Sequence, residues 1–335
     1  MIKNLRFDKY LTLKFPNYSR AFLKSQIKSG DVLVNGKAKK PSYVLKENDR
    51  VEINIKEKAA TRLGPNQAIR LNVIYEDKNI VAIDKPAGIS THPAKPDETN
   101  TIANALLAYY PDIKEVGDEP NLRLGIVHRL DKDTSGILLI AKNNQAFEWL
   151  KKQFSQRKVV KRYLALTAGK MKEQQGVISK PVSRTQGTIK RTTAPILGVK
   201  EAITYYKVIQ YFSCHPELVS GSHKMPKQAS PERGRRVRHE ENAFTFIEAE
   251  PKTGRTHQIR VHLASIGHPL AGDKLYGFKN QICPAGLKRH FLHASYLKIS
   301  LPDGKMVELY SKLPEDLRLV LADLNSKNQL KKINL

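Results

Sequence analysis

The first 60 residues alternate between two hydrophobic periods, which predicts a small module of its own. Apolar residues recur at helical spacing over residues 5–15 and again over 19–30, where Ser19 suits an N-cap and Gly30 suits a helix stop. The following segment to residue 53 alternates as strands do, with Asn35-Gly36 as a hairpin turn and Asn48-Asp49 as a second turn before a closing strand. We therefore expect two helices followed by a hairpin.

Residues 61–70 contain Gly64 and Pro65 and break the periodicity, so we interpret them as a linker to a second domain over 71–335. Short apolar runs in that domain predict strands at residues 71–77, 79–86, 136–142, 161–169, 203–209, 244–251 and 292–301. Stretches of helical spacing at 101–110, 145–154 and 256–267 predict helices. Strict βαβ repetition is absent from the order of these segments. The expected class is α+β, with a mixed, largely antiparallel sheet.

Residues 213–242 fit neither pattern, because they contain three prolines and almost no apolar periodicity between two clear strands. Loops of this length inside a compact domain are either functional or disordered. The composition favours a disordered insertion, although its basic run RGRRVR could contact phosphate.

The net charge of the chain indicates which kind of molecule it binds. The chain has 58 Lys and Arg against 32 Asp and Glu, a net charge of +26, and residues 1–60 alone carry 14 against 6, or +8. Such an excess favours a polyanion such as nucleic acid. No apolar run is long enough to span a membrane and no signal peptide is evident, so we expect a cytoplasmic protein. Its two cysteines, Cys214 and Cys283, suit neither a disulfide framework nor a zinc site.

The densest group of charged residues surrounds Asp131, in the sequence HRLDKD on a loop between predicted strands. Neighbouring cations stabilise an ionised carboxylate, which makes Asp131 a candidate nucleophile or base. Asp133 is the competing candidate, although its following Thr-Ser-Gly favours a role in building the turn. The motif alone is equally compatible with a surface turn.

A second group places Arg255, His257, Arg260 and His262 within one short segment. His257 and His262 are five residues apart, which does not bring them to one helix face, so a metal site is not expected. The arginines suit phosphate binding or an ion pair with an anionic catalytic group. Tyr163 begins an apolar strand, where its ring could stack on a base or simply pack.

The N-terminal segment from Ser19 to Ile53 resembles the alpha-L RNA-binding motif, found in a ribosomal small-subunit protein and several RNA-modifying enzymes. The alternative is a solvated lysine-rich face. The resemblance implies that the helix start and the helix-to-strand loop face RNA, through Ser19, Arg20, Lys24, Lys28, Asn35 and Lys37.

The rest of the chain resembles the RluA-type family of RNA pseudouridine synthases. The resemblance rests on several segments in order: residues 73–93, 125–142, 161–166, 180–184, 251–277 and 292–299. It departs from the family at the 213–242 insertion and at Asp84, where asparagine is more usual. Neither departure falls on a catalytic position.

This resemblance implies a role for each candidate. Asp131 would be the catalytic carboxylate, either attacking the ribose or removing its C2′ proton, and Arg260 would pair with it. Arg129 would help to extrude the target nucleotide, since a stacked base must flip out to react. Tyr163 would stack near the base, and His128 and Arg255 would add contacts to RNA.

The same resemblance favours uridines of large-subunit ribosomal RNA as the target, with no metal and no organic cofactor. Two alternatives stay open: a transfer RNA target, or a ribosome-associated factor that binds RNA without chemistry. A carboxylate among the cations argues against pure binding, which uses cations only. Nothing in the sequence requires more than a monomer.

Overall fold

The computed structural model divides the chain into two compact units, residues 1–61 and 62–335. Ser19, the ends of the chain and most of the predicted insertion lie outside the described residues, which are 5–15, 18, 20–54, 63–93, 98–118, 123–185, 188–194, 199–213 and 243–333.

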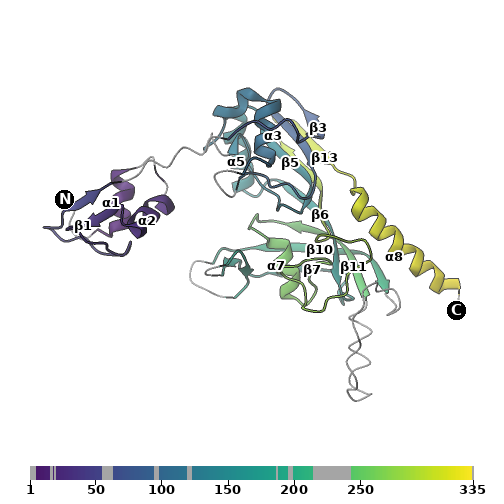
Figure 1. Ribbon diagram of the computed structural model, residues 1–335. Helices are drawn as coiled ribbons and strands as arrows, with labels where there is room; N and C mark the ends of the chain where they lie inside the picture. The colour runs from purple at the N-terminus through teal and green to yellow at the C-terminus, as the bar shows by residue number, and fades with distance from the viewer. Residues whose placement is uncertain are drawn as a thin grey trace, which may run out of the picture. The chain divides into compact units, whose positions relative to one another are not determined.

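The N-terminal unit consists of two helices and a two-stranded sheet (Figure 1). Helical spacing places the fully buried Phe7 and Leu11 on one face of α1, and Leu23 and Ile27 on one face of α2. These faces pack with the strands into one apolar core. The bounds are α1 Phe7–Lys14, α2 Arg20–Ser29, β1 Val32–Val34 and β2 Val51–Ile53.

The chain turns at Asn35-Gly36, as the sequence predicts, but the strand that follows this turn is not the partner of β1. Both turn residues have positive φ, and beyond them only an isolated bridge links Val34 with Lys37. β1 pairs instead with β2, so Val34 lies opposite Val51. The predicted second strand directly after the turn does not form. The chain instead continues as a loop until β2, which pairs with β1.

The second unit is built on a nine-stranded sheet. The strands run in the order β3-β4-β5-β12-β6-β11-β10-β7, and β13 pairs with β12 beside this path. Among the described strands of this sheet, β5 and β12 form the one parallel pair, so the sheet is mixed and largely antiparallel, as predicted. The bounds are β3 Val73–Glu76, β4 Ile80–Lys85, β5 Ser135–Ala141, β6 Val160–Ala168, β7 Gln175–Ser179, β10 Ile203–Ser213, β11 Ala243–Pro251, β12 Leu292–Ser300 and β13 Met306–Tyr310. A separate pair is formed by β8 Ser183–Arg184 and β9 Arg191–Thr192.

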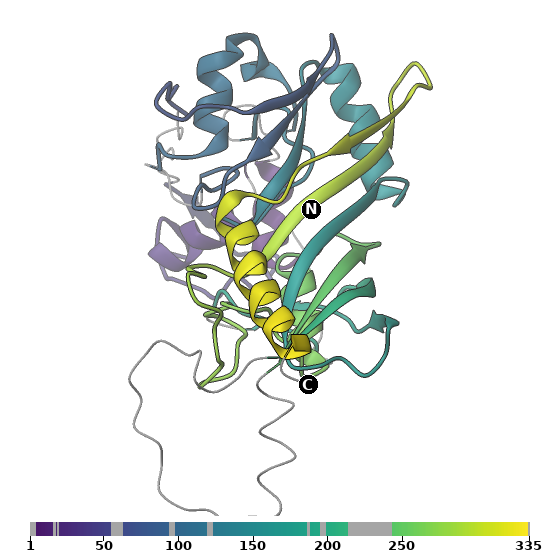
Figure 2. The ribbon, with the colours of Figure 1, turned by 90° about the vertical axis from the view of Figure 1, so that its right-hand side faces the viewer.

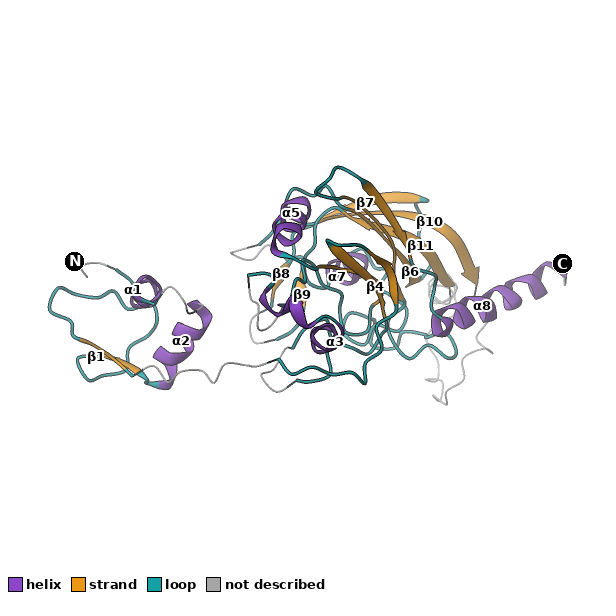
Figure 3. Cartoon of the chain, turned by 90° about the horizontal axis from the view of Figure 1, so that it is seen from above, coloured by secondary structure: helices purple, strands orange, loops and turns teal. Residues whose placement is uncertain are grey.

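Two helices cover opposite faces of the middle of this sheet (Figures 2 and 3). Side chains alternate along a strand, so Ala165 of β6 packs with α7 whereas its neighbour Leu166 packs with α8. α7 spans Gln258–Ser265 and α8 spans Glu315–Ile333. The remaining helices, α3 Ile102–Tyr109, η1 Pro111–Glu115 and α5 Asn144–Ser155, contribute to the core around β4 and β5. The face that carries α7 is the one on which the candidate site lies.

Close approach of β5 to β12 depends on Gly136. This residue has φ +113°, and a Cβ added to it would lie 2.2 Å from the carbonyl oxygen of Ala294. A glycine is therefore required where the parallel pair begins. Because Gly136 follows Asp131 by five residues, the same contact fixes where the loop carrying Asp131 ends.

The interpretation of residues 61–70 as a linker is wrong for residues 63–70. Ile69 is buried in the core of the second unit, and Leu63 packs against that core. Asn66 donates to the carbonyl of Thr99 and accepts from Ala68, while its backbone N–H donates to Asn104. Gly64 and Pro65 break the period here because the segment follows the surface of the core without regular structure.

No helix within the described ranges combines the length and the apolar composition needed to cross a bilayer.

Candidate active site

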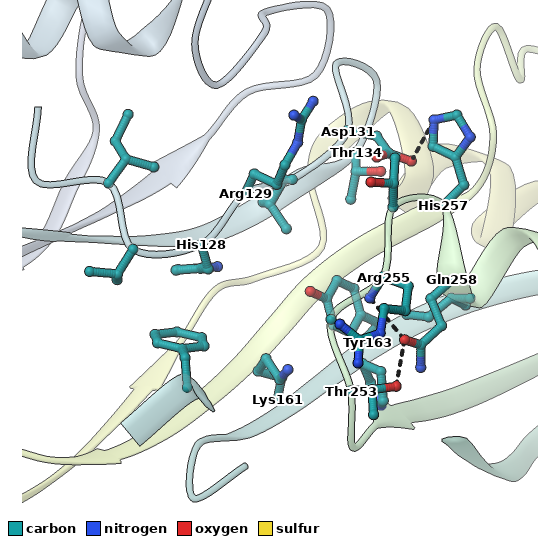
Figure 4. Close-up of a pocket in the computed structure, with 18 of the residues that line it drawn as sticks. His128, Arg129, Asp131, Thr134, Lys161, Tyr163, Thr253, Arg255, His257 and Gln258 are labelled. Carbon is teal, nitrogen blue, oxygen red and sulfur yellow. Dashed lines mark hydrogen bonds and ion pairs between the residues drawn. The ribbon is translucent and has the colours of Figure 1, made fainter. Parts of the chain in front are cut away.

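A pocket of about 470 Å³ opens on the α7 face of the sheet. Most of its lining comes from three segments: the loop before β5, the start of β6, and the turn that leads from β11 into α7. The end of α5, His92 and Leu292 complete it. Figure 4 shows Asp131 beside His257, with His128 and Lys161 farther along the wall. Residues distant in sequence, from 92 to 292, therefore meet at one site.

Asp131 forms an ion pair with Arg260 inside this pocket. The Nη1 atom of Arg260 lies 3.1 Å from Oδ2 of Asp131. The Asp131 side chain is 17% exposed, so it remains accessible from the pocket, whereas the Arg260 side chain is 9% exposed. The predicted pairing of these two residues is thus present, at a separation of 129 positions along the chain.

Arg260 is also bound by a carboxylate that the sequence did not single out, Asp273. Its Nε and Nη2 atoms donate to the two oxygens of Asp273 at 2.7 and 2.8 Å. Burial alone would lower the pKa of Arg260, but the hydrogen bonds to Asp273 and the charge of Asp131 outweigh burial and raise it. Burial would raise the pKa of Asp273, and Arg260 holds it below its ordinary value. Arg260 and Asp273 are therefore both charged at neutral pH.

Buried anchors hold the loop that carries Asp131. The hydroxyl of Thr91 donates to the carbonyl of Leu130 and accepts from its N–H. The ammonium of Lys85, fully buried, donates to the carbonyls of Pro86, Ile89 and Lys132 at 2.7 to 3.1 Å. Burial lowers the pKa of Lys85 to about 7. The loop is therefore fixed to the segment after β4 before any ligand arrives.

His257 occupies a strained position next to Asp131. Its φ of 57° is left-handed, a conformation that side-chain-bearing residues adopt with strain, and strain of this kind collects at functional sites. Its Nε2 atom lies 3.8 Å from Oδ2 of Asp131, and its Nδ1 lies 2.9 Å from the hydroxyl of Tyr276. That hydroxyl accepts from the N–H of Arg191. Burial lowers the pKa of His257, so a neutral imidazole faces the carboxylate.

Tyr163 lies near the start of β6, where it pairs with Ala249 of β11 and Ala294 of β12. It lines the pocket on the same face of the strand as Lys161. Burial, together with the charge of Asp131, raises the pKa of Tyr163. Its phenol therefore keeps its proton at neutral pH and offers a ring and a donor to the pocket.

The other two predicted residues of the HRLD motif differ in their surroundings. The Nε2 atom of His128 accepts from the N–H of Leu139, and its ring stacks on Phe154 at 4.8 Å between centroids. Burial lowers the pKa of His128 to about 3, so the imidazole is a neutral part of the wall. Arg129 is exposed, with Nη1 at 3.2 Å from Nε2 of His92. Burial lowers the pKa of His92 to about 4, which leaves it free to accept from Arg129.

Positive charge dominates the remaining lining. Asp131 is the one carboxylate among the described residues that line the pocket. Arg255 is among the cations, and its Nε also donates to the carbonyl of Glu201. The Lys and Arg residues of the lining are Arg123, Arg129, Lys151, Lys161, Lys252, Arg255 and Arg260. This surface suits the phosphates of RNA.

The candidate RNA-binding residues of the N-terminal unit fall into different environments. Arg20 and Lys24 form ion pairs with the buried Asp8, at 2.8 and 3.3 Å, but remain partly exposed. Lys28 and Lys37 are exposed. Ser19 lies outside the described residues. The side chain of Asn35 is occupied. Its amide nitrogen donates to Asp49, and its oxygen accepts from the N–H of Arg50.

Sequence reasoning missed Asp273 and Lys85. The turn after Asp131 contains a backbone hydrogen bond, in which the carbonyl of Asp131 accepts from the N–H of Thr134. Asp133 is exposed and its carbonyl accepts from Arg289. An acidic residue directly after a glycine turn in the arginine-rich segment was the available signal for Asp273. No group of three or more His, Cys, Asp or Glu in the described part of the chain could hold a metal ion.

Comparison with protein families identifies both units. Residues 79–265, more than half of the chain, match the family described as RNA pseudouridylate synthase. Residues 5–51 match the S4 domain. The matched ranges contain Asp131, Tyr163 and Arg260 in the first and Arg20 in the second.

Two human structures share the fold. RNA Pseudouridylate Synthase Domain Containing 1 aligns with 75% of this chain and 86% of its own, at 26% identity and a TM-score of 0.53. RNA Pseudouridylate Synthase Domain Containing 4 aligns with 76% of this chain and 93% of its own, at 24% identity and a TM-score of 0.52. The likeness to the second protein concerns the fold alone.

Curated relatives agree over most of the chain. An uncharacterized RNA pseudouridine synthase of Aquifex aeolicus is 38% identical, covering 84% of this chain and 80% of its own. Ribosomal large subunit pseudouridine synthase D of Escherichia coli strain K12 is 35% identical, covering 93% and 88%. The predicted resemblance is confirmed: the chain belongs to the RNA pseudouridine synthase family, isomerases that act on RNA.

Proposed function

We propose that this protein converts specific uridines of large-subunit ribosomal RNA to pseudouridine, with Asp131 as the catalytic carboxylate. The observation that carries the proposal is that the described residues lining the pocket include one carboxylate and seven Lys and Arg residues. Cations attract the RNA backbone, and a carboxylate opposes that attraction. A carboxylate in this position is explained if Asp131 reacts with the nucleotide.

The ribosomal target is supported by relatives. Escherichia coli ribosomal large subunit pseudouridine synthase D covers 93% of this chain, and the relative from Xanthomonas campestris with the same name covers 95% at 33% identity. These alignments extend over both units, including the S4 domain. We propose that the S4 domain contributes to binding the same RNA, and that the protein acts as a monomer in the cytoplasm.

In the proposed reaction, Asp131 either attacks C1′ of the ribose or removes the C2′ proton, and the bond between C1′ and N1 of uracil breaks. The freed base rotates and its C5 bonds to C1′. On the first route this displaces the carboxylate of Asp131 from its ester, and on the second the proton returns from Asp131 to C2′. C5 then loses its hydrogen as a proton, and N1 takes one up. Arg260 orients Asp131, and Arg129 takes the position of the extruded base. The protonated phenol of Tyr163 supports the ring of the flipped uracil.

Tritium release distinguishes this function from its alternatives. The protein is incubated with large-subunit ribosomal RNA or with bulk transfer RNA, each labelled at C5 of uridine. We expect release from the ribosomal RNA only, because formation of the new bond displaces the hydrogen at C5. Release from transfer RNA alone would overturn the ribosomal target.

A binding factor without chemistry would behave differently. It would bind ribosomal RNA with an affinity that falls as salt rises, yet would release no tritium from either RNA. That pair of results would overturn the catalytic proposal. A salt-independent affinity would instead remove the electrostatic part of the account.

A further inference from the structure

Arg260 is one guanidinium shared between two carboxylates, and the two contacts differ. Asp273 accepts hydrogen bonds from Nε and Nη2 of Arg260 in a bidentate pair. Asp131 accepts one hydrogen bond, from Nη1, at 3.1 Å. A bidentate pair fixes the plane of the guanidinium as well as its position. Asp273 therefore holds Arg260, and Asp131 makes the weaker contact that a substrate can displace.

Asp273 is itself fixed by the backbone that surrounds it. Its Oδ1 accepts from the N–H groups of Leu275 and Tyr276, at 2.9 and 3.1 Å. The preceding Gly272 has φ +73°, and a Cβ there would lie 2.3 Å from the carbonyl of Arg289. The Asp273 side chain has no exposed area. Its position is thus set by the fold and does not depend on RNA.

The charges of these three groups make the arrangement useful to a reaction at Asp131. In both proposed routes Asp131 loses its charge, as an ester to C1′ or as an acid after it takes the C2′ proton. The electron pair of the broken bond between C1′ and N1 leaves with uracil. An arginine paired with Asp131 alone would then be a buried cation without a partner, which is costly. Asp273 prevents this, because it remains ionised and bound to Arg260.

We propose that Asp273 is a positioning residue for the reaction at Asp131, acting through Arg260: it holds the guanidinium in place and balances its charge when Asp131 gives up its own. This inference rests on the proposed function. It assigns to Asp273 an effect on the chemical step and none on RNA affinity.

The test is Asp273→Asn, which keeps the acceptor for Leu275 and Tyr276 but faces Arg260 with an amide. Single-turnover tritium release from ribosomal RNA should slow about 100-fold, while the Kd for that RNA stays within about twofold. Glu308→Gln is the matched control, because Glu308 forms an exposed ion pair with Lys298 at 2.7 Å outside the pocket. It should leave the rate unchanged.

A double-mutant cycle separates positioning from a merely structural role. If Asp273 acts through Arg260, then Asp273→Asn should change the rate of an Arg260→Gln variant by less than about threefold. Additive losses in the double variant would show that Asp273 acts through the backbone turn instead, and would overturn the proposal. So would an unchanged rate in Asp273→Asn with wild-type affinity.

A second variant applies if Asp273→Asn does not fold. Arg260→Lys keeps one positive charge but cannot bind two carboxylates with a planar fork, and it should lose rate without losing RNA affinity. A wild-type rate in Arg260→Lys would overturn the proposal. No tritium release by the unaltered protein would overturn the proposed function, and this inference with it, whereas release by the unaltered protein and by Asp273→Asn at equal rates overturns the inference alone.

Discussion

Each unit of the chain contains a cluster in which one central charged side chain binds several partners of opposite sign, and the central sign differs between the two. In the N-terminal unit the buried group is an anion, Asp8, which accepts from Arg6, Arg20 and Lys24 at 2.8 to 3.3 Å. In the second unit the central group is a cation, Arg260, bound by two carboxylates. One cluster therefore has surplus positive charge and the other surplus negative charge.

The surplus charge is exposed in each case, and its sign matches a different task. The three cations around Asp8 are 41 to 46% exposed while Asp8 is fully buried, so the cluster presents positive charge to solvent. At Arg260, the accessible member is Asp131. A buried counter-ion holds the exposed charges in both units, but the first arrangement suits attraction of a phosphate backbone and the second suits chemistry.

Of the changes that separate the two clusters, removal of the central cation is expected to have the largest effect. Arg260→Gln leaves Asp131 and Asp273 close together without the charge between them, and the rate of tritium release should fall about 1,000-fold. Single-turnover kinetics and thermal unfolding, measured together, distinguish lost chemistry from lost folding. If Arg260→Gln folds and keeps a near wild-type rate of tritium release, the cluster around Arg260 does not serve the chemistry, and the contrast with the cluster around Asp8 is contradicted.

Removing the central anion should act on stability. Asp8→Asn leaves three cations around a neutral group and should destabilise the N-terminal unit by about 3 kcal/mol. Hydrogen exchange of the peptides within residues 5–51 measures this in the full chain. Glu52→Gln, at an exposed carboxylate of the same unit, is the control. Equal exchange in both variants would contradict a structural role for Asp8.

The same cluster should respond to acid. Burial alone would raise the pKa of Asp8, but hydrogen bonds from Arg6, Arg20 and Lys24 outweigh it and lower the pKa from 3.8 to about 2. The stabilisation is therefore complete above pH 4 and is lost as the pH falls toward 2. The protection of the same peptides, measured as their exchange rate relative to unstructured peptide at the same pH, should fall across that window in the wild type and not in Asp8→Asn.

The smallest effect is expected from the exposed cations themselves. Replacing Arg20 and Lys24 together by glutamine should weaken binding of ribosomal RNA about 10-fold and reduce the salt slope by about 1 to 2. Lys305→Gln, an exposed lysine of the second unit, serves as the control. A slope that stays unchanged would mean that these two cations contact only Asp8.

Patterns along the chain predicted what depends on local periodicity and on motifs. The strands β3 to β6 and β10 to β12 and the helices α3, α5 and α7 follow from their apolar periods. The ion pair between Asp131 and Arg260 followed from the family resemblance and not from spacing, because 129 residues separate the two. Sequence analysis did not identify α8, β7 or β13.

What could not be predicted depends on pairing between distant segments. β1 could have paired across Asn35-Gly36, and only packing of the whole unit selects Val51 as the partner of Val34. Asp273 shows the same limit, since an acidic residue after a glycine is common and only the folded chain brings it to Arg260. His128 is a part of the wall because a backbone N–H of β5 reaches its ring.

The central claim is that Asp131 carries the chemistry while the cations carry the binding. Its most direct test compares the wild type with Asp131→Asn in single-turnover tritium release from large-subunit ribosomal RNA, at protein concentrations that saturate the RNA. We predict that Asp131→Asn binds the RNA within about twofold of the wild type and releases tritium at least about 10,000-fold more slowly. Equal release by the two proteins would contradict the account.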